Sequence, residues 1–372
     1  MFIKKICLRR FRNIQDADIS LPEGVSILLG RNAQGKTNLL EAIHLAGVGR
    51  SHRTARDTDM IMSGAESAYV HVLTRHSDGT HEVTLKLNTR GKRETIVGGS
   101  PIKRAADLMG HAPCVLFSPE DLALVKEAPA ERRRFIDIAL SQMSPQYFTY
   151  LQKYTRVLAQ RNRLLKAIRA GEANPGELDA WDALLTEVGG RIMKSRASYI
   201  ERLAFHASAA HEYMTEGGET LTVAYSANAA KATSKAAYDE NARRGEPWDM
   251  AKRLAERREL DIIRSNTSVG PHRDDIILNV NGGSARSYGS QGQQRTAALS
   301  LRLGALKVFH EARGETPVLL LDDALSELDP GRKRRLFSYI KNTQCVLTCA
   351  DESDVEGMAV ERVIMVSGGV FI

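Results

Sequence analysis

The chain contains the stretch Gly30-Arg31-Asn32-Ala33-Gln34-Gly35-Lys36-Thr37, which fits the pattern G-x-x-x-x-G-K-[ST] at every fixed position. The apolar run Val25–Leu29 before it predicts a buried strand, and residues 38–45 after it predict a helix. In that context the glycines let backbone N–H groups surround phosphate oxygens, and the start of the helix adds its partial positive charge. We therefore predict a nucleoside triphosphate site in which Lys36 contacts the outer phosphates and the Thr37 hydroxyl binds Mg²⁺. The alternative is a chance glycine-rich turn, and both flanking elements argue against it.

Composition places the chain among ordinary globular proteins. Its 372 residues are 42% hydrophobic and 26% charged, which is long enough for two or more domains. Lys and Arg (52) outnumber Asp and Glu (45), and the net charge of +7 suits a polyanionic partner or simply a basic surface. The scattered Cys7, Cys114, Cys345 and Cys349 argue against a disulfide framework or a zinc site. No signal peptide or membrane span is predicted, so we expect a cytoplasmic protein.

The first hundred residues predict strands around the P-loop. A strand over residues 3–11 is followed, after the P-loop and its helix, by alternating segments at 69–74, 83–87 and 94–97. Turn residues separate these segments, so they predict an antiparallel meander. From residue 131 to 214 the apolar period becomes helical, with a break at 171–176, and predicts two long antiparallel helices.

The end of the chain returns to an α/β pattern. Residues 250–264 predict a helix, Gln291–Arg313 another, and Val318–Leu321 a strand. A helix over 331–342, a strand over 344–348 and a hairpin over 362–372 complete the order. We predict an α/β fold divided into a first head segment (1–120), an inserted helical arm (121–265) and a second head segment (266–372).

The predicted strand Val318–Leu321 ends in two carboxylates, Asp322 and Asp323. Asp322 is well placed to bind the Mg²⁺ that bridges the phosphates. Asp323 could orient or deprotonate the attacking water, which makes it, with Lys36, a candidate catalytic residue. An apolar strand that ends in two aspartates is by itself weak evidence for phosphoryl transfer. Together with the P-loop it is strong evidence, because that reaction needs both groups.

Upstream, Ser290-Gln291-Gly292-Gln293 opens the predicted helix Gln291–Arg313. This start presents a hydroxyl, free N–H groups and the positive end of the helix dipole to a phosphate, or it is only a helix cap. With the P-loop and Asp322-Asp323, it resembles the signature motif of ABC-type ATPase heads. Ser326-Glu327-Leu328-Asp329 resembles their D-loop, with Asp329 as its acidic residue.

A narrower resemblance, to the RecF family of bacterial recombination and repair proteins, covers almost the whole chain. Besides the P-loop, residues 290–295 and residues 321–329, it rests on Leu8-Arg9-Arg10-Phe11-Arg12-Asn13, Phe117-Ser118-Pro119-Glu120-Asp121-Leu122, Glu131-Arg132-Arg133-Arg134-Phe135 and Val269-Gly270-Pro271-His272-Arg273-Asp274-Asp275. The resemblance implies an ABC-type P-loop ATPase head with an antiparallel β subdomain and an inserted helical arm, related to chromosome-maintenance ATPases.

The resemblance also implies how such a protein works. ATP and Mg²⁺ would drive homodimerisation, with Ser290, Gly292 and Gln293 of one subunit closing over ATP held by the other. It implies binding to duplex DNA or single-strand/duplex junctions, association with the nucleoid, and RecO and RecR as partners in loading RecA.

Two positions depart from the wider ABC class. Asp323 stands where most ABC heads carry Glu, and Thr348-Cys349-Ala350-Asp351 stands where transporters carry a histidine. RecF-like proteins share both departures, and slow hydrolysis is the reasonable expectation. Glu120 and Asp121 lie near the expected Q-loop glutamine, which has no assigned position.

The predicted arm carries a basic run without acidic residues. On a helical wheel one basic residue, Arg161, falls toward the apolar face, and the rest project away from it. A solvated helix face and a DNA contact are the two interpretations, and the lack of interleaved acids favours DNA. Few aromatic residues accompany the run, so duplex binding is favoured over single-strand stacking. The DNA candidates are Lys153, Arg156, Arg163, Lys166 and Arg169, with shorter clusters at 132–134 and 332–335.

His272 has two interpretations: a metal ligand beside Asp274 and Asp275, or part of a structural turn. The turn is favoured because no second histidine lies at ligand spacing.

Three other functions compete with an ATP-switched DNA clamp or loader. The long insertion between Lys36 and Asp322 argues against a transporter ATPase. A small-molecule kinase would leave residues 290–295 and the D-loop without a purpose. A structural chromosome-maintenance protein would need sustained heptads, which the short arm lacks.

Overall fold

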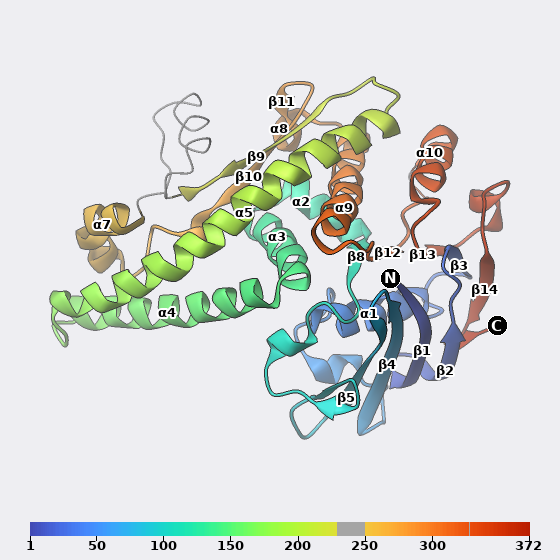
Figure 1. The fold of residues 1–372 in the computed structure, drawn as a ribbon, viewed down its shortest axis with the longest axis horizontal. Coiled ribbons are helices and arrows are strands. Elements are labelled where there is room, and N and C mark those ends of the chain that lie inside the picture. The colour runs from blue at the N-terminus through green and yellow to red at the C-terminus, as the bar shows by residue number, and fades with distance from the viewer. Residues whose placement is uncertain (229–249, 327) are drawn as a thin grey trace.

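The computed structural model describes residues 1–228, 250–326 and 328–372. The predicted mixed α/β architecture is confirmed. A parallel sheet and an antiparallel sheet pack on α1 (Lys36–Val48), and long helices project away from them as an arm (Figure 1). The hydrophobic cluster around α1 includes Leu8 and Val70 from one sheet and Leu28 and Val346 from the other.

The sheet that carries the P-loop has the order β15-β14-β3-β13-β12-β8, and its neighbours are parallel except for the pair β14 and β15. Strands β3, β8, β12 and β13 are buried along their whole length, as a parallel sheet covered on both faces requires. Parallel strands end at a shared edge, so the residues after β3, β12 and β13 meet there. The bounds are β3 Val25–Leu29, β8 Cys114–Phe117, β12 Val318–Leu321, β13 Cys345–Cys349, β14 Arg362–Ser367 and β15 Val370–Phe371.

The predicted antiparallel meander is confirmed and is larger than expected. Its order is β2-β1-β4-β5-β6-β7, with alternating burial along β1 and β4. The sequence did not single out β2 or β7. The bounds are β1 Phe2–Phe11, β2 Ile14–Ser20, β4 Ser67–His76, β5 Gly79–Asn88, β6 Glu94–Val97 and β7 Ser100–Pro101.

Two long helices form the arm, as predicted. Helix α4 (Pro145–Arg169) and helix α5 (Leu178–Met214) lie against each other, with the predicted break between them, and α7 (Met250–Arg264) packs on both (Figure 1). A three-stranded sheet beside α5 has the order β11-β10-β9, and sequence reasoning missed it. Its strands are β9 Leu221–Ser226, β10 Asp275–Val280 and β11 Gly283–Ser284.

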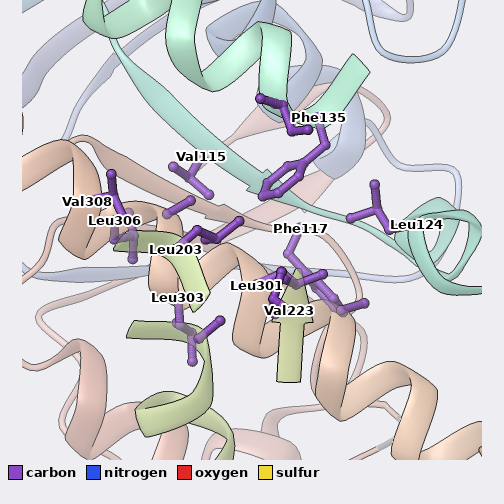
Figure 2. Packing of buried hydrophobic residues seen from close by; sticks show 14 of the residues in the cluster. Val115, Phe117, Leu124, Phe135, Leu203, Val223, Leu301, Leu303, Leu306 and Val308 are labelled. Carbon is purple, nitrogen blue, oxygen red and sulfur yellow. The ribbon is translucent and has the colours of Figure 1, made fainter. Parts of the chain in front are cut away.

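Helix α9 (Gln291–Arg313) joins the arm to the head and has the predicted bounds. Figure 2 shows its Leu301, Leu306 and Val308 in one apolar cluster with Leu203 of α5 and residues of β8, α2 and α3. At the crossing with α5 the backbones nearly touch, because a Cβ on Gly304 would lie 2.8 Å from the Ala207 nitrogen. The core therefore continues from head to arm, and the division at residues 120 and 265 stays a prediction.

The remaining helices are short or lie at the edges of these layers. Within the described ranges, none of the helices combines the length and apolarity that crossing a bilayer requires. The α-helices are α2 Leu122–Lys126, α3 Pro129–Met143, α8 Ala285–Tyr288 and α10 Pro330–Ile340. The 3₁₀ helices are η1 Asp57–Met60, η2 Ala105–Leu108, η3 Pro119–Asp121, η4 Pro175–Glu177, η6 Pro271–Arg273 and η7 Glu352–Val355.

Arg161 holds three segments of the arm together. Its side chain is fully buried, as its place toward the apolar face predicted. The Arg161 Nε donates to Asp182 Oδ1 of α5 at 2.6 Å, and its Nη1 donates to Asp261 Oδ2 of α7 at 2.8 Å and to the Thr267 hydroxyl at 2.9 Å. Asp261 is equally buried, so the two charges depend on each other.

Candidate nucleotide-binding site

The P-loop folds around its own lysine. Lys36 Nζ donates to the Gly30 carbonyl and, at 3.0 Å, to the Arg31 carbonyl. Gly35 has a φ of 114°, and a Cβ there would lie 2.9 Å from Asn13 Oδ1, so this position requires glycine. Burial lowers the pKa of Lys36, although nearby acidic groups oppose the shift. A phosphate group would offer this partly buried cation a stronger partner than two carbonyls do.

Asp322 links the P-loop to the end of β12. Its Oδ1 accepts hydrogen bonds from the Thr37 hydroxyl at 3.0 Å and from the Thr348 hydroxyl at 2.8 Å. Burial raises the pKa of Asp322, and the two hydroxyls oppose that shift. The predicted pairing of Thr37 with Asp322 is therefore present. A hydroxyl and a carboxylate at hydrogen-bond distance form a donor set that suits Mg²⁺.

Thr348 is a site residue that sequence reasoning placed only as a departure from the ABC pattern. Besides donating to Asp322, its hydroxyl accepts the Asp323 N–H at 2.8 Å. Leu321 of β12 pairs with Leu347 of β13, so the residues that follow the two strands are neighbours. This register cannot be read from the sequence, which therefore held no signal for Thr348.

Asp323 has a left-handed backbone, with a φ of 48°. Asp tolerates this conformation better than most residues. Its side chain is exposed and lines the same pocket as the P-loop. Asp323 is therefore open to solvent beside the phosphate cradle, as a group that orients water must be.

An open pocket of about 550 Å³ lies over these residues, a size suited to a small-molecule ligand. It brings together the predicted loop residues 32–37 with Asp322 and Asp323. Sequence reasoning assigned no role to the other residues that line it, which are Asn13, Asn38, Arg53, Pro119, Glu120, Thr348, Cys349 and Ala350.

Arg53 adds a second cation to the pocket wall. Its Nη1 donates to Asn38 Oδ1 at 2.9 Å and lies 3.5 Å from Glu41 Oε2. Glu41 is fully buried and is also held by Arg12, at 2.6 and 2.9 Å. Burial would raise the pKa of Glu41, but hydrogen bonds from Arg12 and Ser51 lower it. Arg12 and Asn13 belong to a sequence stretch that carries the family resemblance, so the sequence pointed to them. No sequence pattern pointed to Arg53.

Glu120 and Asp121 occupy different environments. Glu120 lines the nucleotide pocket, whereas Asp121 turns away and accepts two hydrogen bonds from Arg302 at 2.6 and 3.0 Å. Of the two, Glu120 is therefore the residue positioned to contact a ligand.

Ser290 caps α9, with its hydroxyl accepting the Gln293 N–H at 3.2 Å and the Gln293 side chain accepting the Ser290 N–H at 2.9 Å. This is a capping box, and both Ser290 and Gly292 are exposed. Within the described residues, the pocket lining includes none of 290–293. One chain alone therefore does not bring the predicted signature residues to its own P-loop.

The D-loop residue Asp329 caps α10 next to α9, accepting the Arg332 N–H at 2.9 Å. A Cβ on Gly292 would lie 3.8 Å from Arg332 Nη1, so the starts of α9 and α10 are neighbours. Glu327 of the same motif lies outside the described residues. The exposed signature and D-loop segments thus share one surface.

All five arm candidates for DNA contact, Lys153, Arg156, Arg163, Lys166 and Arg169, are exposed on α4. Within the described residues, none of them forms an ion pair with a carboxylate. The shorter clusters differ. Arg132 is buried against Asp275 at 2.6 Å, and Lys333 and Arg335 pair with Asp354 and Glu216, so these three side chains are engaged in internal ion pairs.

His272 belongs to a structural turn, the interpretation that the sequence favoured. Its Nδ1 lies 2.7 Å from the Tyr154 hydroxyl and its Nε2 lies 3.0 Å from the Thr267 carbonyl. Asp274 instead accepts hydrogen bonds from Arg196, Tyr225 and the Asn228 N–H. Both side chains are thereby committed to internal bonds.

The P-loop, the carboxylates after β12 and the antiparallel sheet on α1 define a P-loop ATPase head of the ABC and chromosome-maintenance type. Residues 2–370 match the family described as "RecF/RecN/SMC N terminal domain". The chain belongs to the RecF family of DNA replication and repair proteins.

Individual relatives cover almost the whole chain. The DNA replication and repair protein RecF of Acetivibrio thermocellus is 38% identical over 352 residues, which are 95% of this chain and 94% of that protein. RecF of Symbiobacterium thermophilum is 40% identical over 376 residues, with 100% and 98% covered.

Solved structures agree with this assignment. "Structure of the recombination mediator protein RecF-ATPrS in RecFOR pathway" matches with a TM-score of 0.87 and 36% identity, covering 100% of this chain and 97% of that one. An Smc head bound to the C-winged helix domain of ScpA matches with a TM-score of 0.60 and 15% identity, covering 100% and 96%, and shows likeness of fold alone.

Proposed function

We propose that this chain binds and slowly hydrolyses ATP with Mg²⁺, and that ATP closes it into a homodimer on DNA. The observation that carries the proposal is the contact between Thr37 and Asp322 beneath the open pocket. The solved RecF structures described with ATP and with ATPrS support ATP as the nucleotide.

The roles of the pocket residues follow from their positions. The backbone of residues 30–37 would surround the phosphates, and Lys36 would neutralise the outer ones. Thr37 and Asp322 would hold Mg²⁺, which supplies charge neutralisation between phosphates. The exposed Asp323 would orient the attacking water. Its side chain is one methylene shorter than Glu, so it reaches less far, which supports slow turnover.

The separation of the two halves of the site supports the proposed dimerisation. Ser290 and Gly292 are exposed, Gln293 is half-buried, and none of the three lines the pocket of its own chain as far as the described residues show. A second copy would bring them over the ATP, adding a helix start to the bound phosphates. The neighbouring Asp329 would lie at the same interface.

Replacing Ser290 with Arg is expected to abolish ATP-dependent dimerisation, and hydrolysis with it, because a bulky side chain would occupy the phosphate position. ATP binding by a single subunit should stay nearly unchanged, since the P-loop is intact. Light scattering with ATP and Mg²⁺, beside an ATP-binding assay, measures both quantities.

Ser290→Asp separates this role from helix capping. Asp is as good an N-cap as Ser, but its charge repels a phosphate. We expect Ser290→Asp to prevent dimerisation as Ser290→Arg does. Dimerisation of both variants at the wild-type ATP concentration would show that Ser290 is only a cap.

We propose that DNA lies along the exposed basic face of α4. Five cations without carboxylate partners among the described residues would exchange counterions for phosphates, giving sequence-independent binding to duplex DNA or to single-strand/duplex junctions. The mild net charge of +7 agrees with such a partner.

Reversing Arg156, Arg163 and Lys166 to Glu is expected to weaken duplex binding and to flatten the dependence of log K on log salt. Each lost phosphate contact should reduce the slope by about 0.9. Fluorescence anisotropy over a salt series with ATP present measures it. The matched control reverses the exposed Lys4, Lys92 and Lys103 of the antiparallel sheet region, which changes the net charge equally. Equal losses in both triple variants would exclude α4 as the DNA surface.

The cellular role proposed here is recombinational repair and replication restart, with RecO and RecR as partners and RecA loaded indirectly. The supporting facts are the RecF relatives and the solved RecF structures described as part of the RecFOR pathway. A cytoplasmic, nucleoid-associated location follows from this role. Another chromosome-maintenance ATPase is the nearest alternative, and the RecF match in sequence and fold favours the repair role over it. The insertion that forms the arm argues against a transporter ATPase.

A further inference from the structure

Three histidines and two carboxylates meet at the turn between β4 and β5, far along the chain from the nucleotide site. His76 ends β4, Asp78 lies in the turn and His81 belongs to β5. Thr74 pairs with His81 and His76 pairs with Gly79, so His76 and His81 are diagonal neighbours on one face of the sheet. Their rings stack with centroids 4.1 Å apart.

The potential ligand atoms are close enough to share one ion. One ring nitrogen of His76, one of His81 and a carboxylate oxygen of Asp78 all lie within 4.8 Å of one another. Asp78 Oδ1 is 3.1 Å from His81 Nε2. Ligands about 2.0–2.1 Å from a zinc ion are about 3.3 Å apart, so small side-chain rotations would complete such a site.

Outer contacts already orient both rings. His111 Nδ1 lies 3.2 Å from His81 Nδ1, and Glu315 Oε2 lies 2.9 Å from His76 Nδ1. The other nitrogen of His76, Nε2, lies 3.1 Å from both the Thr74 hydroxyl and the His111 carbonyl, so it would exchange these two partners for the ion. In metal sites the second ring nitrogen of a histidine is held in this way, by a carboxylate, a carbonyl or a similar group. The carboxylate of Glu315 also accepts a hydrogen bond from the Ser77 N–H, which fixes its position beside His76.

We propose that His76, Asp78 and His81 form a site for one divalent transition-metal ion of the zinc class, with His111 and Glu315 as its supporting shell. Imidazole with a single carboxylate suits Zn²⁺ or Co²⁺ and not Mg²⁺ or Ca²⁺, which prefer oxygen ligands. The cysteine spacing argued against a zinc site, but it carries no information about histidines that strand pairing brings together.

The position assigns the ion a structural role. His111 lies three residues before β8 and Glu315 three residues before β12, and these strands are paired through Cys114 and Val318. The ion would therefore fasten the β4–β5 turn to the amino edge of the parallel sheet, opposite the edge that carries the P-loop. Binding to the folded state alone would stabilise the head.

The test is a titration of the full chain, without a histidine tag and stripped of metal, with Co²⁺ and then with competing Zn²⁺. We expect one equivalent of Co²⁺ to produce a visible absorption band that Zn²⁺ abolishes, and Zn²⁺ to raise the unfolding temperature. Asp78→Asn and His81→Gln should each weaken Co²⁺ binding at least tenfold.

Two features of the variants keep the test decisive. The Asp78 side chain is 70% exposed, so Asp78→Asn should fold like the wild type without metal. His71→Gln, on the same strand but outside the cluster, should bind Co²⁺ like the wild type. Lack of saturable binding, or binding that survives both Asp78→Asn and His81→Gln, would overturn the proposal.

Discussion

Replacing Lys36 with Met is expected to weaken ATP binding about 100-fold, because hydrogen bonds to a charged group contribute about 1.5–3 kcal/mol. Lys36 Nζ lies over the P-loop, bonded to the Gly30 and Arg31 carbonyls, where the outer phosphates would replace those partners. Met has a similar length and leaves the loop backbone unchanged, so the loss would be one of charge. Equilibrium binding of a fluorescent ATP analogue gives the affinity.

Thermal unfolding of Lys36→Met without nucleotide is the control, and it should match the wild type. Among the described residues, the hydrogen-bond partners of this lysine are carbonyls of its own loop, so its loss should cost little stability. Unchanged ATP affinity in a folded Lys36→Met protein would remove the basis for the P-loop assignment.

Replacing Arg161 with Met is expected to lower the free energy of unfolding by about 3–5 kcal/mol, since it leaves a buried carboxylate without its cation. Asp261 is completely buried and lies 2.8 Å from Arg161 Nη1, and Asp182 loses a bond of 2.6 Å. Urea unfolding followed by circular dichroism measures the change.

Arg163→Met on the same helix is the matched control. Arg163 is exposed, and its one described polar contact is a 3.5 Å approach to Gln160, so its replacement should change the free energy by about 0.5 kcal/mol or less. Similar stabilities for the two variants would mean that the buried network does not hold α4, α5 and α7 together.

The elements that sequence predicted best combine a local pattern with clear ends. Helix Gln291–Arg313 has a serine cap, an apolar face and a glycine after its last residue, and its bounds are as predicted. The same holds for Val318–Leu321, a short apolar run that ends at two aspartates. Arg161 could be separated from the other arm cations because helical periodicity alone fixes its face.

The features that sequence missed depend on contacts between distant segments. Thr348 joins the site because β12 and β13 are paired in a particular register, and nothing in residues 344–351 announces that pairing. Arg53 reaches the pocket through Asn38 and Glu41, and the histidine cluster assembles from a hairpin and two loops. Strand β9 is short and flanked by a weakly patterned segment, so its own sequence does not predict a strand. It forms a strand because it pairs with β10.

The unbroken helix α5 would act as a lever pivoting at its close contact with Gly304 of α9. It has 37 residues and touches α9 backbone to backbone at Ala207, and its far end lies beside the basic helix α4 (Figure 1). From Ala207 to that end the helix runs about 40 Å, so a tilt of about 5° would move the end by about 3.5 Å. That travel is close to the axial step of about 3.4 Å between successive phosphates on one DNA strand. If ATP closes two copies at the start of α9, as proposed above, a small rotation there would move the arm by about one phosphate step along a bound duplex.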